Sequence, residues 1–202
     1  MYKQMGRFGA AVTVAAMGLG APSAQAATED LTVDNSTFAT AQDVGPFSSE
    51  GVINVFGFRG TVLGGLVNDD SNPDFYKFAV AANQQLTLRV DTPEGPVMNN
   101  DPMVGLLDPT GVLLAADDDS GPGYDSLLKY TIVTPGTYVA VVAGYPGIAF
   151  WLNPPEITAG GSTDFVYQLN IQTQPVPIPA AAALLGSGLL GLAGIKRRRS
   201  PA

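Results

Sequence analysis

The chain has 202 residues, with ten lysines and arginines against eighteen aspartates and glutamates, and it contains neither histidine nor cysteine. The missing histidines exclude Ser-His-Asp catalysis and most zinc and copper sites, and the missing cysteines exclude disulfides and thiol nucleophiles. A metal ion held by side chains must therefore be bound through oxygen atoms, as calcium and magnesium are.

The first 26 residues are predicted to be a secretory signal peptide. A positively charged n-region precedes an apolar run at residues 8–19, and Ala24 and Ala26 supply the small residues of a cleavage site. Cleavage by signal peptidase after Ala26 would leave Ala27 as the new N-terminus. We therefore expect the rest of the chain to be exported across the inner membrane.

The exported part is strongly acidic. Residues 27–175 contain four lysines and arginines and all eighteen acidic residues, which gives a net charge of −14. Nucleic-acid binding depends on neutralising phosphates with cations, so this surface excludes DNA and RNA as partners. The same charge would attract divalent cations.

Residues 27–172 predict one all-β domain, a jelly-roll-like antiparallel β-sandwich. Short apolar runs are separated by Gly, Pro, Asp and Asn, and they recur at the spacing that is typical of an all-β sandwich. Polar and apolar residues alternate within half-buried strands, with Leu88 on an inner face and Thr87 on an outer one. Such strands are predicted at residues 74–80, 85–91, 127–132 and 165–172. Further strands are predicted at residues 52–56, 59–63, 103–107 and 112–116, with a central strand, apolar on both faces, at 137–143.

Turns and long connections complete the predicted sandwich. Asp108-Pro109-Thr110-Gly111 has Pro and Gly at the positions that a tight turn favours. Residues 92–102 and 145–163 are long enough to be rim loops. The second of them contains Phe150 and the single tryptophan, Trp151, which are predicted either to cover the core or to form a ligand platform.

Two acidic clusters are candidate calcium sites. Calcium is bound by several carboxylates together with loop carbonyls, and the glycines after the first cluster supply a flexible loop. Both patterns are also those of solvated turns, in which Asx side chains bond their own backbone. The first cluster consists of Asp117, Asp118, Asp119 and Asp125, and the second of Asp69, Asp70 and Asp74.

Four segments in sequence resemble the bacterial pre-peptidase C-terminal domain over residues 35–172. They are Asn-Ser-Thr-Phe-Ala-Thr-Ala-Gln at 35–42, Asp-Phe-Tyr-Lys-Phe at 74–78, Asp-Pro-Thr-Gly at 108–111 and Gly-Thr-Tyr at 136–138. This resemblance implies a jelly-roll β-sandwich that usually accompanies secreted enzymes as an accessory module. No enzyme domain is recognisable beside it in this chain.

The C-terminal segment is predicted to be a membrane-spanning sorting signal. A proline-rich spacer at 173–179 precedes an uncharged apolar helix at 180–195, which would be about 24 Å long, and a basic cytoplasmic tail at 196–202. The order of Val176, Pro177 and Pro179, the apolar run, and then Lys196, Arg197, Arg198 and Arg199 resembles the PEP-CTERM sorting signal of Gram-negative bacteria. This resemblance implies recognition by an exosortase, removal of the tail and delivery to the cell surface or extracellular matrix.

These patterns predict a non-catalytic, surface-sorted protein that serves as a matrix, exopolysaccharide-associated or adhesion component. One alternative is a carbohydrate- or protein-binding module that uses the Phe150–Trp151 loop. The other is a hydrolase that acts through carboxylates alone, for which two carboxylates would have to face each other across a cleft.

Overall fold

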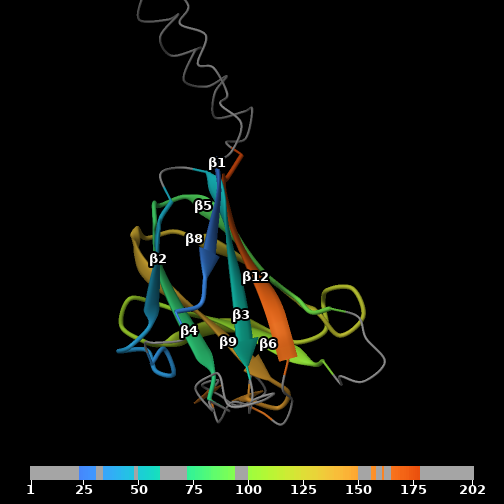
Figure 1. Cartoon of the computed structure of the whole chain (residues 1–202). Coiled ribbons are helices and arrows are strands. Elements are labelled where there is room, and N and C mark those ends of the chain that lie inside the picture. Colours follow the sequence, from blue (N-terminus) through green and yellow to red (C-terminus); the bar gives the residue numbers. More distant parts are fainter. Residues whose placement is uncertain are drawn as a thin grey trace, which may run out of the picture.

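The computed structural model describes residues 23–30, 34–47, 50–59, 72–93, 100–149, 156–157, 161 and 165–177. Within these ranges the chain forms twelve strands and no helix (Figure 1). In this part of the chain nothing therefore has the length and apolar character of a membrane-spanning helix. The predicted apolar helix at 180–195, the basic tail and most of the predicted signal peptide lie outside the described residues.

Ten of the strands form two five-stranded sheets, and the remaining two, β10 and β11, form a short hairpin. The first sheet has the order β1 (Ser23–Thr28), β3 (Gly51–Arg59), β12 (Phe165–Pro175), β5 (Gln84–Asp91) and β8 (Ser126–Ile132). The second has the order β2 (Gln42–Pro46), β4 (Asp74–Val80), β9 (Gly136–Gly144), β6 (Pro102–Leu107) and β7 (Leu113–Asp117). The hairpin pairs β10 (Ile148–Ala149) with β11 (Glu156–Ile157).

The path of the chain between the sheets is that of a jelly roll. Among the long strands β3 to β9 and β12, the chain crosses to the other sheet at every step except the hairpin from β6 to β7. The pairs formed among these eight strands are antiparallel. Two edge strands depart from this pattern, because β1 runs parallel to β3 and β2 runs parallel to β4.

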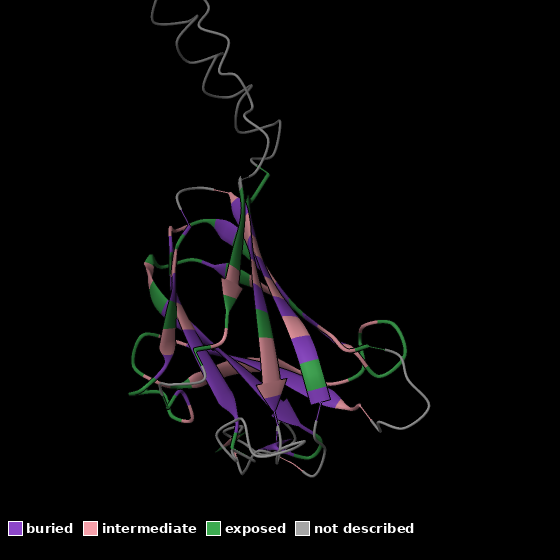
Figure 2. Cartoon of the chain, viewed as in Figure 1, coloured by how far each residue is buried: buried purple, intermediate pink, exposed green. Residues whose placement is uncertain are grey.

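The core lies between the two sheets, where the alternating residues meet. Leu86 and Leu88 of β5 and Leu169 of β12 are fully buried, and their neighbours on the outer face are not. Figure 2 shows buried and less buried residues alternating along the strands. A second apolar cluster, which includes Val139 and Val141, lies on the other side of β9. This explains why β9 is apolar on both faces and confirms the prediction of a central strand, since β9 pairs with β4 and β6.

Three features differ from the predicted strands. The predicted strands at 52–56 and 59–63 are not separate, because β3 continues through Gly57 to Arg59, and residues 60–63 lie outside the described part. Strands β1 and β2 were not predicted, since their small and polar residues carry no alternating apolar pattern. Strand β12 runs to Pro175, three residues beyond the predicted end of the domain.

Candidate functional site

Three carboxylates come together at one rim of the sandwich. Asp118 and Asp119 follow the end of β7, and Asp101 precedes β6, to which β7 is paired antiparallel. One oxygen of each carboxylate lies within 4.8 Å of the others. The structure thus brings two predicted metal ligands together with Asp101, which the sequence pattern does not predict because seventeen positions separate it from Asp118.

The environment of these carboxylates disfavours their charged forms. Burial, together with the negative charges of Asp119, Asp101 and Asp117, raises the pKa of Asp118 to about 6. Burial also raises the pKa of Asp101, again with a contribution from Asp119. The Oδ1 atoms of Asp101 and Asp118 are shielded from solvent and have no hydrogen-bond partner in the described structure. Such oxygens are suited to bind a cation.

The other two aspartates of the first cluster have structural partners instead. The Oδ2 atom of Asp117 accepts hydrogen bonds from the backbone nitrogens of Leu127 at 2.7 Å and Ser120 at 3.2 Å. The Oδ1 atom of Asp125 accepts from Thr92, at 3.0 Å from its backbone nitrogen and 2.9 Å from its hydroxyl. Asp117 and Asp125 therefore hold the rim loop in place, and neither belongs to the group of three.

The second predicted cluster is divided. Asp69 and Asp70 lie outside the described residues, and Asp74 is buried between the sheets. The Tyr167 hydroxyl donates to Asp74 Oδ2 at 2.7 Å and lies 2.6 Å from the Tyr76 hydroxyl. Burial, followed by the charge of Glu29, raises the pKa of Asp74 well above its usual value, although the Tyr167 hydrogen bond and the positive charge of Arg59 oppose this.

Asp74 therefore belongs to a buried polar network that joins both sheets. Glu29 accepts hydrogen bonds from the Phe58 backbone at 2.8 Å and from Asn35 at 3.3 Å. Arg59 is only 1% exposed, donates to the Gly161 carbonyl at 3.3 Å and lies over the Phe165 ring. The positive charge of Arg59 acts on Asp74, and the Tyr167–Asp74 hydrogen bond connects β12 of the first sheet with β4 of the second.

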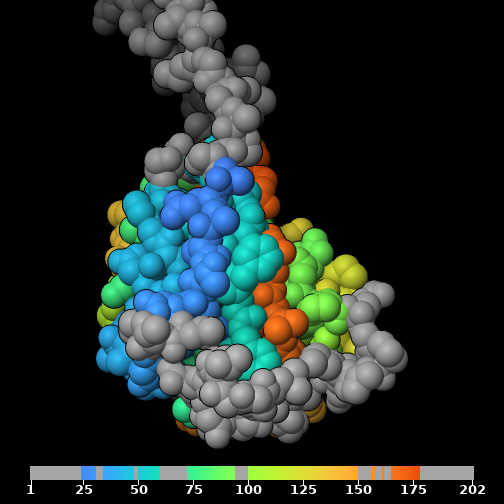
Figure 3. All heavy atoms as spheres, viewed as in Figure 1, coloured from blue at the N-terminus to red at the C-terminus, as the bar shows by residue number. Residues whose placement is uncertain are grey.

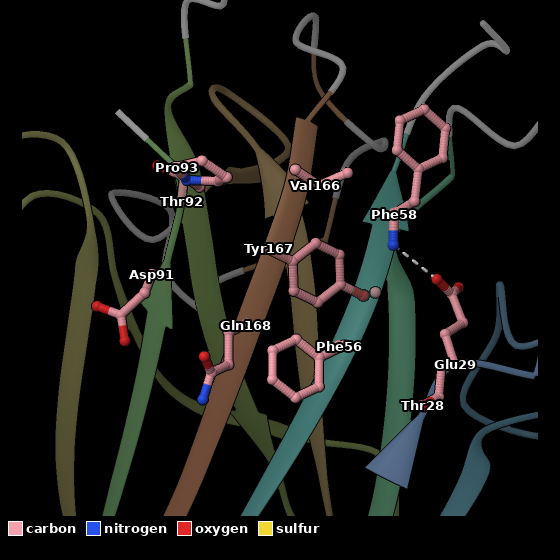
Figure 4. A pocket seen from close by; sticks show the side chains of 11 residues that line it. Thr28, Glu29, Phe56, Phe58, Asp91, Thr92, Pro93, Val166, Tyr167 and Gln168 are labelled. Atoms are coloured by element: carbon pink, nitrogen blue, oxygen red, sulfur yellow. Dashed lines mark hydrogen bonds between the residues drawn. The ribbon is translucent and has the colours of Figure 1, made fainter. Parts of the chain in front are cut away.

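The outer face of the first sheet contains two hollows. The first, of about 610 Å³, is bounded by Phe56 and Phe58 of β3, Val166 and Gln168 of β12, and residues 91–93 (Figure 4). The second, of about 690 Å³, lies farther along the same face. It is lined by polar side chains that include Gln85, Thr87, Arg89, Lys129, Gln172 and Gln174. Figure 3 shows β1, β3, β12 and β5 side by side on this surface.

The structure describes only some of the residues that are predicted to direct signal cleavage and sorting. Ala24 and Ala26 lie in β1 with exposed side chains. Val176 and Pro177 follow β12 directly, and the Val176 backbone nitrogen donates to the Asn83 carbonyl at 3.0 Å. The remaining sorting residues lie outside the described part of the chain, as do Phe150 and Trp151 of the predicted platform. These unplaced sorting residues are Pro179, Lys196, Arg197, Arg198 and Arg199.

Comparison with known proteins gives a family match for the middle of the chain. Residues 73–144 match the family model of the bacterial pre-peptidase C-terminal domain. This segment runs from the start of β4 to the end of β9 and confirms that part of the predicted resemblance. Pre-peptidase C-terminal domains are β-sandwich modules that are often non-catalytic and occur on secreted proteins.

Several solved structures are similar to the chain, and one of them illustrates the match. It is the 1.0 Å crystal structure of the pre-peptidase C-terminal domain of collagenase from Bacillus anthracis. The two are 19% identical with a TM-score of 0.38, and the match covers 65% of this chain and 93% of that one. A search of curated protein sequences gave no match.

Proposed function

We propose that this chain is an exported, surface-sorted and non-catalytic protein that serves as a matrix, exopolysaccharide-associated or adhesion component. The observation that carries the proposal is the pre-peptidase C-terminal match at residues 73–144, which lies in a sandwich flanked by two segments with the patterns of sorting signals. Signal peptidase would remove the N-terminal segment and an exosortase the C-terminal one, after transient anchoring in the inner membrane.

The hydrogen-bond partners of the carboxylates beside the first hollow favour a non-catalytic role over a hydrolase that acts through carboxylates. Glu29 and Asp91 both border the first hollow. However, Glu29 accepts hydrogen bonds from Phe58 and Asn35, and Asp91 is paired with Arg89 and accepts from Asn170 at 2.9 Å. A general acid must be able to reach the bond that is cleaved and donate its proton to it. Glu29 and Asp91 are instead held by their hydrogen-bond partners.

We also propose that Asp101, Asp118 and Asp119 bind calcium at the rim. Two observations support this: the three carboxylate oxygens within 4.8 Å of one another, and the shielded, unpartnered Oδ1 atoms of Asp101 and Asp118. A divalent cation would relieve the mutual repulsion of these groups. Asp119 is exposed, so water molecules would complete the coordination shell.

Fractionation of native cells followed by intact-mass spectrometry tests the proposed function. We expect the surface fraction to contain a chain that begins near Ala27 and lacks the cluster that ends at Arg199. Surface material that still contains Met1 or Arg199 would contradict the proposed processing. Hydrolysis of a polysaccharide or peptide by the purified chain, abolished by Asp91→Asn, would contradict the non-catalytic role.

A further inference from the structure

We propose that the outer face of the β1-β3-β12-β5-β8 sheet binds an extended polysaccharide chain. The inference rests on the proposed function, because it assigns a ligand and a surface to the exported domain. It differs from the predicted platform at Phe150 and Trp151, since it uses side chains of β3, β12, β5 and β8.

Amide side chains follow one another along this face. Every second residue of β12 from Gln168 to Gln174 points outward, and each of these residues carries an amide. The cross-strand register places Asn54 of β3 beside Asn170 and Gln85 of β5 beside Gln174. An amide both donates and accepts hydrogen bonds, as a sugar hydroxyl does. A ladder of amides can thus bond successive hydroxyl groups of a polysaccharide.

The aromatic end of the face supplies the apolar part of such a site. Phe56 is 50% exposed and Val166 is 42% exposed, and Phe58 is half-buried next to Val166 in the register. Together they line the hollow of about 610 Å³, in which Phe56 lies beside Gln168 (Figure 4). Sugar rings have apolar C–H faces that can cover an exposed aromatic ring, and their hydroxyl edges would then reach the neighbouring amides.

Several of these polar groups are already held in place. The Gln168 amide donates to the Asn170 side-chain oxygen at 3.4 Å, and the Asn170 amide donates to Asp91 at 2.9 Å. Asp91 is in turn paired with Arg89. Groups that are ordered before binding lose less conformational entropy when a ligand arrives. The chain of contacts crosses from the aromatic hollow toward the polar one, so the face can hold one extended ligand.

The charge of the face favours a polysaccharide over other large partners. The cations Arg89 and Lys129 are balanced by the carboxylates of Asp91 and Glu29, so the face and its first hollow have a net charge of 0 within a domain of −14. Two cations, one of them paired, are too few to neutralise the phosphates of a nucleic acid. Protein interfaces have apolar centres, whereas the centre of this face consists of amides. Jelly-roll and related β-folds offer such faces to sugars elsewhere.

Affinity electrophoresis of the full chain in a non-sugar detergent tests this inference. The gels contain either hydroxyethylcellulose, which is neutral, or alginate, which carries carboxylates. We expect at least one of them to retard the wild type. Phe56→Ala and Gln172→Ala should each weaken that retardation about fivefold or more, as expected for one lost contact. Phe38→Ala is the matched control, because Phe38 is 37% exposed but packs beside Gly111 at the β6–β7 hairpin.

A second pair of variants separates neutral from acidic polysaccharides. If alginate binds through Lys129, Lys129→Ala should weaken its binding, whereas Lys77→Ala, on β4 of the other sheet, should not. Circular-dichroism melting of each variant must match the wild type, so that loss of folding is not taken for loss of binding. The inference is overturned if neither polymer retards the wild type, or if the Phe56 and Gln172 variants bind as Phe38→Ala does. Neither result would bear on processing, which the mass of the native chain tests separately.

Discussion

Replacing Asp118 with asparagine should stabilise the protein at neutral pH and not at acidic pH. In the folded chain the pKa of Asp118 is raised from 3.8 to about 6, mainly by burial. The folded state therefore holds this proton more tightly than the unfolded state does. The contribution of Asp118 to stability is greatest below pH 4, falls as the pH rises toward 6, and is lost above pH 6. Asp118→Asn removes this loss because the amide carries no charge at any of these pH values.

The size of the stabilisation by Asp118→Asn follows from the same pKa shift. A pKa displaced from 3.8 to about 6 corresponds to about 3 kcal/mol at neutral pH. Because Asp118 is only half-buried, solvent screening reduces this value, and we expect Asp118→Asn to raise the free energy of unfolding by about 1 kcal/mol at pH 7. For a domain of this size, that is a rise in melting temperature of about 3 °C.

The assay is thermal melting at low ionic strength between pH 4 and pH 7.5, first with a chelator. Asp117→Asn is the matched control, since its carboxylate accepts hydrogen bonds from Leu127 and Ser120, so this variant should lower stability by about 1–2 kcal/mol. Equal effects of Asp118→Asn at pH 4 and pH 7, or destabilisation at pH 7, would refute the reasoning.

Calcium provides the second arm of the same experiment. With a dissociation constant of about 10⁻⁴–10⁻³ M, a few millimolar calcium should stabilise the wild type by roughly 1–2 kcal/mol at pH 7. Magnesium at the same ionic strength should do less. The double variant Asp118→Asn, Asp119→Asn should lose this preference. If calcium and magnesium shift the wild type equally, and the double variant responds in the same way, the three carboxylates form only a solvated rim.

Two further substitutions test the core and the buried network by chemical denaturation. Leu88→Ala should cost about 2–5 kcal/mol because Leu88 is fully buried, whereas Thr87→Ala on the outer face should stay within about 1 kcal/mol. Equal losses at the two positions would show that the register of β5 is wrong. Tyr167→Phe should cost about 1–3 kcal/mol, since Asp74 and Tyr76 then lose a buried partner. An unchanged stability would show that these groups find other partners.

The alternating pattern was enough to predict most of the sandwich. In β5 from Leu86 to Val90 and in β12 from Phe165 to Ile171, every second residue is apolar, and these residues lie in the core. Strand β9 could be predicted as central because it has no polar face to expose to water. Strands β1 and β2 could not be predicted in this way, since edge strands of small and polar residues depend on the neighbour with which they pair.

The candidate sites were harder to predict than the strands, because their residues come together only through the pairing of strands. Asp118 and Asp119 could be selected from the sequence, but Asp101 approaches them only because β6 and β7 form a hairpin. Consecutive aspartates also point in different directions, which is why Asp117 bonds the backbone while Asp118 does not. The amide face requires the register of β3, β12 and β5 together. The outward side of one strand shows only a polar pattern, which any solvated sheet would share.

The predicted signal cleavage has a consequence for the first sheet that can be tested directly. Cleavage after Ala26 removes four of the six residues of β1, which pair with residues 51–54 of β3. The side chains of Ala24 and Ala26 are exposed, so little apolar contact is lost with them. The loss falls mainly on backbone hydrogen bonds along the edge of β3, and water can replace these at an open edge.

We therefore expect recombinant chains that begin at Ser23 and at Ala27 to melt within a few degrees of each other. Amide hydrogen exchange at residues 51–54 should be faster in the shorter chain, because these residues lose their β1 partners. Exchange at Leu169 and its neighbours in the middle of β12 should be the same in both, since β12 is paired on both sides with β3 and β5. If the shorter chain fails to fold, β1 is an essential part of the domain, and cleavage after Ala26 is incompatible with a folded mature protein. If residues 51–54 remain equally protected, another segment replaces β1 at this edge once the N-terminal residues have been removed.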